Sequence, residues 1–133
     1  MTGYPTASRA YLESSVLTAS PGQLVVMLYD GAGRFLARAG AAVRAADAGA
    51  AAEPLRRTHA ILDELLITLD PEAGEVAERL ESIYLFCKRT LIEAQLALDP
   101  EPIERVAGLL AELRGAWAEA AENAQPVPAG TEG

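Results

Sequence analysis

The sequence predicts an all-α protein: an antiparallel up-down four-helix bundle with a short N-terminal segment packed on it. Alanine is the commonest residue, and no stretch alternates apolar and polar residues with the period of two typical of a half-buried strand. Apolar residues instead recur at spacings of three and four, which is the helical period. Half of the 133 residues are hydrophobic, which is enough to enclose one core. Short connections make consecutive helices antiparallel neighbours.

Charge and composition exclude several classes of function. The 19 acidic and 11 basic residues give a net charge of −8, whereas binding to nucleic acid or to anionic lipid requires a basic face. The longest apolar run, residues 24–29, is far shorter than the roughly 20 residues that cross a bilayer. The N-terminus lacks the features of a secretory signal, and one cysteine cannot form an internal disulfide. We therefore expect a cytoplasmic protein that neither binds nucleic acid nor inserts into a membrane.

Capping residues mark the start of the first helix. Ser20 can cap it, Pro21 suits its first turn, and Gln23 completes a capping box. The alanine- and glycine-rich stretch 40–52 is expected to fray its end. The first helix is therefore predicted over residues 21–47.

Three further helices are predicted, over residues 53–69, 74–98 and 100–122. Pro54 fits the first turn of the second helix, and Asp99 is a good cap for the fourth. The bundle thus spans residues 21–122. Residues 1–20 are expected to form a strap or short helix, and the polar residues 123–133 a disordered tail.

Three of the predicted helices carry a single apolar stripe, as ordinary bundle helices do. The stripes are Leu24, Leu28, Ala32, Phe35, Ala39 and Val43 in the first helix; Leu55, His59, Leu62, Leu66 and Leu69, widened by Leu65, in the second; and Ile103, Val106, Leu110, Leu113 and Trp117 in the fourth. Val26 and Met27 point away from the first stripe. Gly31 and Gly33 each cost about 1 kcal/mol relative to alanine within a helix, which predicts the close approach of another backbone.

The third predicted helix has two apolar faces. Its core stripe is Val76, Leu80, Ile83, Cys87, Leu91, Ala94 and Leu98. Leu85, Ile92 and Leu96 form a second stripe on the opposite side, and Phe86 lies between the two. Monomeric proteins rarely leave such a face in water. The N-terminal segment, a second copy of the chain, or a foreign partner could each cover it.

Catalytic constellations are missing from the sequence. His59 is the only histidine and lies on a core stripe, although a phosphotransfer bundle using it is an alternative hypothesis. Cys87 also lies on a core stripe and is interpreted as a small buried hydrophobe. We expect a binding protein without enzymatic activity, metal or cofactor. A purely self-associating structural bundle is a further alternative.

Several motifs resemble the FliS family of flagellar secretion chaperones. The most distinctive stretch runs through Thr18-Ala19-Ser20-Pro21, Leu24 and Met27-Leu28-Tyr29-Asp30-Gly31. Further matches are Ala10-Tyr11, Arg34-Phe35-Leu36, Ile61-Leu62-Asp63-Glu64-Leu65, Gly74-Glu75-Val76-Ala77 and Leu109-Leu110-Ala111-Glu112-Leu113-Arg114 with Trp117. The chain departs from the family pattern at Ala73, where a glycine is usual, and at Leu85, where a polar residue is common.

The resemblance implies a four-helix bundle that binds the C-terminal segment of flagellin in the cytoplasm, prevents its polymerisation and delivers it to the type III export apparatus. It also implies that the N-terminal segment can cover part of the binding surface. The candidate partner-binding residues are Tyr11, Val16, Val26, Met27, Asp30, Leu85, Phe86, Ile92 and Leu96. An i,i+4 ion pair with Arg34 is the alternative role of Asp30. Binding of the export gate, binding of an anti-sigma factor and dimerisation without client stay open.

Overall fold

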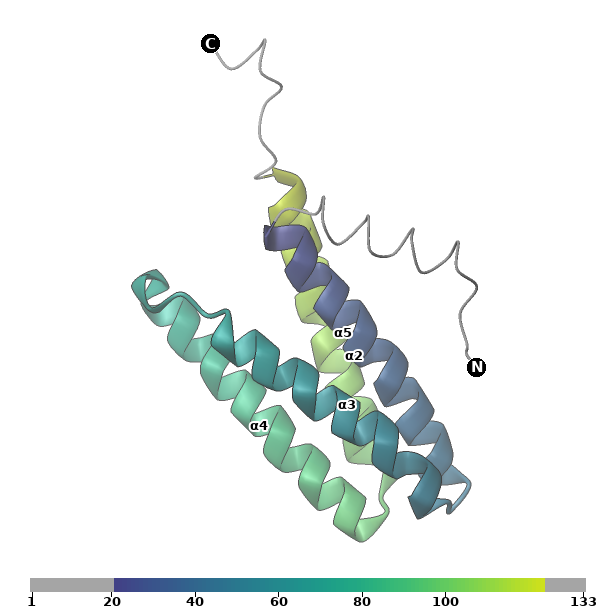
Figure 1. Ribbon diagram of the computed structural model, residues 1–133. Coiled ribbons are helices and arrows are strands. Elements are labelled where there is room, and N and C mark those ends of the chain that lie inside the picture. Colours follow the sequence, from purple (N-terminus) through teal and green to yellow (C-terminus); the bar gives the residue numbers. More distant parts are fainter. Residues whose placement is uncertain (1–20, 124–133) are drawn as a thin grey trace, which may run out of the picture.

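The structure, a computed structural model, describes residues 21–123 as four antiparallel helices (Figure 1). These are α2 (Pro21–Arg44), α3 (Ala48–Ile67), α4 (Glu75–Ala97) and α5 (Pro100–Asn123), with a short 3-10 turn, η1 (Pro71–Ala73), before α4. No strand occurs within this range, which confirms the all-α prediction. The predicted strap, residues 1–20, and residues 124–133 lie outside the described residues. Asn123 ends α5 and is not part of a tail.

The junction between α2 and α3 differs from the prediction. The side chain of Asp47 accepts a hydrogen bond from the Ala50 N–H at 3.0 Å and caps α3, which begins at Ala48, five residues before the expected start at residue 53. Alanine has the highest helix propensity, so the alanine-rich stretch continues as helix once it is capped. Pro54 therefore lies in the helix interior and not in its first turn. There it removes the N–H that would bond to the Ala50 carbonyl.

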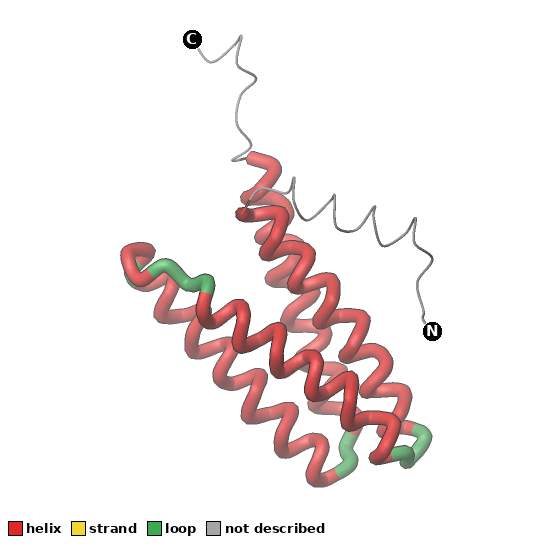
Figure 2. The backbone as a smooth tube through the Cα atoms, in the orientation of Figure 1, coloured by secondary structure: helices red, strands yellow, loops and turns green. Residues whose placement is uncertain are grey.

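The remaining connections are short (Figure 2). Carboxylates cap the helices that follow them. Asp70 accepts a hydrogen bond from the Glu72 N–H at 2.9 Å and starts η1. Gly74 follows with φ of 62°, a conformation that favours glycine, and turns the chain into α4. Asp99 accepts a hydrogen bond from the Glu101 N–H at 3.1 Å, which confirms it as the cap of α5.

Small residues bring α2 close to both of its neighbours. A Cβ atom added at Gly31 would lie 3.3 Å from the Ile61 side chain of α3, and one at Gly22 would lie 3.1 Å from Ala121 of α5. The close approach predicted at Gly31 is therefore present. The same prediction is wrong for Gly33, where nothing lies within 4 Å. As a result, α2 packs more closely on α3 and α5 than α4 does.

The buried stripe of α2 is rotated from the predicted one. Tyr29 and Leu36 are core residues, whereas Leu24 is 36% exposed and Phe35 is half-buried. Ala32, Ala39 and Val43 of the predicted stripe are buried as expected, and the partly buried Leu28 packs against the core. The rotation is therefore small: Leu24 and Phe35 lie at one edge of the predicted stripe, and Tyr29 and Leu36 lie just beyond its other edge.

Each of the four α-helices contributes to one core. Its members are Tyr29, Ala32, Leu36, Ala39 and Val43 of α2; Ala51, Leu55, Leu62 and Leu65 of α3; Tyr84, Cys87, Leu91 and Ala94 of α4; and Ile103, Val106 and Leu110 of α5. Two residues of the predicted α4 stripe are exposed, Val76 at 60% and Leu98 at 41%. Both lie near the ends of α4, where fewer neighbours cover them.

The two helix pairs converge at one end of the bundle and diverge at the other. The pair of α2 and α5 separates from the pair of α3 and α4 toward the end that holds η1 (Figure 1). Across the core, the hydroxyls of Tyr29 and Tyr84 lie 2.6 Å apart in a buried hydrogen bond that joins α2 to α4. Burial is the main cause that raises the pKa of both phenols, so both stay protonated at neutral pH.

Removing one hydroxyl of this pair should destabilise the bundle. Tyr29→Phe or Tyr84→Phe leaves the other hydroxyl buried without its partner, at a cost of about 1–3 kcal/mol. The double variant removes both polar groups and should lose less than the sum of the two single losses. Urea denaturation of the four proteins in this double-mutant cycle measures the coupling energy, and strictly additive losses would contradict the prediction.

Candidate functional site

The outer face of α4 is apolar and exposed. Leu85 is 46% exposed, Ile92 49% and Leu96 83%. Their spacing of seven and four places them on one side of the helix, away from the buried Cys87 and Leu91. Burying a side chain of this size is worth roughly 1.5–3 kcal/mol, so the face forgoes several kcal/mol while it is in water. Among the described residues nothing covers it.

Phe86 widens this surface. It is 48% exposed and points about 100° round the helix from Leu85, because an α-helix has about 3.6 residues per turn. We call Leu85, Phe86, Ile92 and Leu96 the α4 outer face. Such a face suits an unfolded or amphipathic segment, since an apolar stripe at helical spacing offers successive side-chain contacts.

A second surface is a groove between α2 and α5. Val26 and Met27 are half-buried in it, opposite Gly115 and Ala118. This part of the groove has a volume of about 650 Å³. The groove lies on the side of α2 that the sequence analysis predicted to point away from the core.

Asp30 marks the middle of the α2–α5 groove. Its carboxylate accepts hydrogen bonds from Arg114 of α5 at 2.9 and 3.4 Å. Asp30 therefore pairs across the groove and not with Arg34, its i,i+4 neighbour. Beyond this bridge a further hollow of about 440 Å³ continues between Gly33 and Ala37 of α2 and the facing residues of α5.

Glycines leave open space along the α2–α5 groove. Atoms added as Cβ at Gly33 and Gly115 would meet nothing within 4 Å. Glycine in a helix interior is destabilising by about 1 kcal/mol relative to alanine, and neither position has a neighbour that requires it. Both residues line the groove, so the groove holds more open space than the packing of α2 against α5 requires.

A third surface was missed by the sequence reasoning. At the diverging end, Val76 and Leu80 of α4 face Trp117 and Leu113 of α5 across an apolar cleft of about 430 Å³. A smaller adjoining pocket includes Val25 of α2. The stripe assignment placed these side chains in a closed core, whereas the separation of the helix pairs opens it. Helical periodicity carries no signal for that separation.

The predicted partner-binding residues fall on two separate surfaces. Val26, Met27 and Asp30 lie in the α2–α5 groove, and the other four make the α4 outer face. Tyr11 and Val16 lie outside the described residues. The structure therefore does not gather the predicted residues into one site, and their role in binding stays a prediction.

His59 is poorly placed for phosphotransfer. Its Nε2 atom is buried and has no hydrogen-bond partner, so that nitrogen is not accessible to a phosphodonor. Burial, together with the nearby charge of Lys88, lowers the pKa of His59. Cys87 is fully buried, which raises the pKa of its thiol to about 11 and makes it unreactive, as its position in the stripe indicated.

Residues 21–123 contain neither a metal site nor a membrane-spanning helix. No three side chains of the metal-binding types gather there in a way that could hold an ion. None of the described helices is long and apolar enough to span a bilayer.

Comparison with known proteins identifies one family. The family model described as "Flagellar protein FliS" matches residues 4–124. The chain is 38% identical over 117 residues to the flagellar secretion chaperone FliS of Salmonella typhimurium, covering 86% of this chain and 87% of that protein. It is 37% identical over 118 residues to the protein of that name from Campylobacter jejuni, covering 88% and 92%. The Bacillus subtilis protein is 32% identical over 114 residues, covering 86% and 85%.

The partly buried His59 should make stability depend on pH. Its pKa is lowered on folding, so the unfolded chain binds a proton more readily and the free energy of unfolding falls as pH drops through about 6.5. His59→Gln should flatten this dependence. Urea denaturation of both proteins across that pH range tests it, and equal slopes would contradict the assignment.

Proposed function

This chain belongs to the FliS family of flagellar proteins, and from that premise we propose that it is a cytoplasmic export chaperone that binds the C-terminal segment of flagellin. Binding keeps flagellin from polymerising and allows its delivery to the flagellar type III export apparatus. The chain performs this role by binding alone, without catalysis. Relatives from three bacteria carry the name flagellar secretion chaperone, which supports the proposal.

The exposed α4 outer face is the observation that carries this proposal. A four-helix bundle can turn its apolar side chains inward, yet Leu85, Phe86, Ile92 and Leu96 remain at 46–83% exposure. A face of this kind has a stabilising use only when something covers it. The client segment of an export chaperone is such a cover.

The distribution of the surfaces indicates the form of the client. The α4 outer face and the α2–α5 groove lie on different helices, so a compact ligand cannot fill both. A long segment without structure of its own can pass from one to the other and fold as it binds. Coupled folding of this kind buries roughly 1,000–3,000 Å² and gives a large negative heat-capacity change.

Each surface suits a different part of that segment. The α2–α5 groove, with Gly33 and Gly115 along its floor, admits a client helix at short distance, because no Cβ atoms stand in the way. The Asp30–Arg114 pair offers polar partners in the middle of that groove. The α4 outer face takes apolar side chains of the same client.

We propose that the N-terminal residues Tyr11 and Val16 occupy part of the client-binding surface before the client binds. Removal of residues 1–17 should then tighten flagellin binding, because the client no longer has to displace them.

A second copy of the chain is the alternative cover for this surface. Sedimentation at several concentrations, with and without flagellin, distinguishes the two. Co-purification from the native cytoplasm would identify binding of the export gate or of an anti-sigma factor.

Replacing Leu85 and Ile92 by serine should weaken the complex with a flagellin C-terminal peptide. Each side chain has about half of its burial left to gain, roughly 0.75–1.5 kcal/mol, so the loss of both predicts a decrease in affinity of about 10- to 100-fold. Helicity should not change, because both positions are half exposed in the free chain. Isothermal titration calorimetry measures the affinity.

Ile67→Ser is the matched control for this experiment, because Ile67 is 75% exposed on α3 and lies off the α4 outer face. Its affinity for the peptide should stay within about twofold of the wild type. Full affinity of the Leu85→Ser/Ile92→Ser variant would remove the α4 outer face from the client site.

Gly115→Leu should separate stability from binding. Leucine favours the helix over glycine by roughly 0.5–1 kcal/mol, so the free energy of unfolding should rise. The same side chain fills the α2–α5 groove and should lower affinity for the flagellin peptide by about tenfold or more. Gly115→Ala is the control, because its Cβ meets nothing within 4 Å; it should stabilise without loss of binding. Unimpaired binding by Gly115→Leu would exclude the groove.

A further inference from the structure

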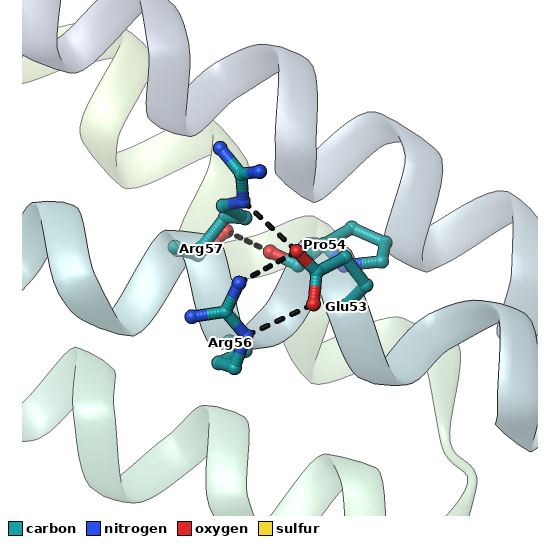
Figure 3. A network of polar contacts seen from close by, with 5 residues as sticks. Glu53, Pro54, Arg56 and Arg57 are labelled. Carbon is teal, nitrogen blue, oxygen red and sulfur yellow. Dashed lines mark hydrogen bonds and ion pairs between the residues drawn. The ribbon is translucent and has the colours of Figure 1, made fainter. Parts of the chain in front are cut away.

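A cluster of arginines lies on the outer surface formed by α2 and α3. Glu53 links two of these arginines. Its carboxylate accepts hydrogen bonds from Arg56 at 2.6 and 2.9 Å and from Arg57 at 2.9 Å (Figure 3). These hydrogen bonds, from Arg56 foremost, lower the pKa of Glu53 to about 2. The carboxylate is therefore ionised at neutral pH and shared by two guanidinium groups.

Phe35 of α2 extends the cluster across the helix boundary. The guanidinium of Arg38 lies 5.6 Å from the centre of its ring, and that of Arg57 lies 5.8 Å from it. Both distances are within the range of cation–π attraction, which holds the two charges in place. We call Arg34, Phe35, Arg38, Arg56 and Arg57 the arginine face.

The arginine face carries unneutralised positive charge. Its four guanidinium groups meet one carboxylate, Glu53, and within residues 21–123 neither Arg34 nor Arg38 forms an ion pair. Residues 1–20 and 124–133 supply only Glu13 and Glu132 as acidic side chains, and residues 1–20 also add a basic one. The ends of the chain therefore contain little that could neutralise the face.

This surplus is unusual for the molecule. The whole chain has a net charge of −8, and among residues 21–123 the basic residues outside the arginine face either pair with one carboxylate or, like Arg79, Arg89 and Arg105, are spread over α4 and α5. Arg44 pairs with Glu104, Lys88 with Asp63, and Arg114 with Asp30. A positive patch on an acidic protein selects a partner by charge complementarity.

We propose that the arginine face binds an acidic segment of a partner protein other than flagellin. Carboxylates of that segment bind the guanidinium groups of Arg34, Arg38 and Arg57, and an apolar side chain packs at the edge of Phe35. Arginine suits this role because its planar fork binds carboxylate in bidentate fashion. A long polyanion is disfavoured, because beyond these four groups it would meet the field of an acidic protein.

The arginine face is separate from the α4 outer face, since its residues belong to α2 and α3. Arg34 also borders the α2–α5 groove, so Arg38 is the better residue for a test. A client on the α4 outer face leaves the arginine face accessible, whereas a client in the α2–α5 groove would share only Arg34 with the acidic partner. This inference does not depend on the identity of the client.

Fluorescence anisotropy with the full chain tests the proposal. The probe is a short labelled peptide rich in glutamate with two leucines, and the variants are Arg38→Glu and Arg105→Glu. Arg105 is the matched control, an exposed arginine of α5 without an ion pair among the described residues. Arg38→Glu should weaken binding by about tenfold or more, and Arg105→Glu by less than about twofold. Added salt should weaken binding to the wild type.

Four outcomes would overturn the proposal. Equal losses in the two variants would mean that net charge alone attracts the peptide. Tighter binding of a labelled oligonucleotide or of anionic vesicles would identify another class of partner. Loss of flagellin-peptide affinity in Arg38→Glu would place the arginine face within the client site. If the flagellin peptide binds the chain and the acidic peptide does not, this proposal fails and the chaperone function stands.

Discussion

The small residues of α2 are the constraint on which the rest of the structure depends. Glycine and alanine let two helices approach α2 closely, with Gly31 against Ile61 of α3 and Gly22 against Ala121 of α5. Between these small residues, Tyr29 and Leu36 are the large side chains that α2 buries. Large residues of the other helices, such as Tyr84 and Leu91 of α4, complete the core.

This unequal packing explains where the apolar surfaces lie. Because α2 is held close on two sides, α4 packs less closely on the bundle, and the helix pairs diverge at one end (Figure 1). The divergence exposes Val76 and opens the cleft beside Trp117. Together with the α4 outer face, it leaves apolar surface that the four helices do not enclose themselves. An export chaperone that wraps an unfolded client needs such surface in the free state.

Sequence reasoning recovers features that depend on local chemistry and loses those that depend on distance between helices. The cap at Asp99 and the second stripe through Leu85 were predicted because capping and helical period are local. Pro54 was misplaced because the cap at Asp47 lies before an alanine run that reads equally well as helix or linker. Val76 was assigned to the core because a period specifies which residues share a face and not how near the facing helix lies.

The tyrosine pair fixes how α4 is aligned with α2. It is a buried side-chain hydrogen bond in a core otherwise made almost entirely of hydrocarbon, where apolar stripes could mesh at more than one setting. If α4 slid along α2 by one helical turn, Tyr84 would move about 5.4 Å and both hydroxyls would lose their partners. Each hydroxyl without its partner costs about 1–3 kcal/mol. The shifted alignment would therefore lose a sizeable part of the free energy of unfolding of a small domain. The hydrogen bond between these two hydroxyls thereby selects one alignment among several that apolar packing alone would allow.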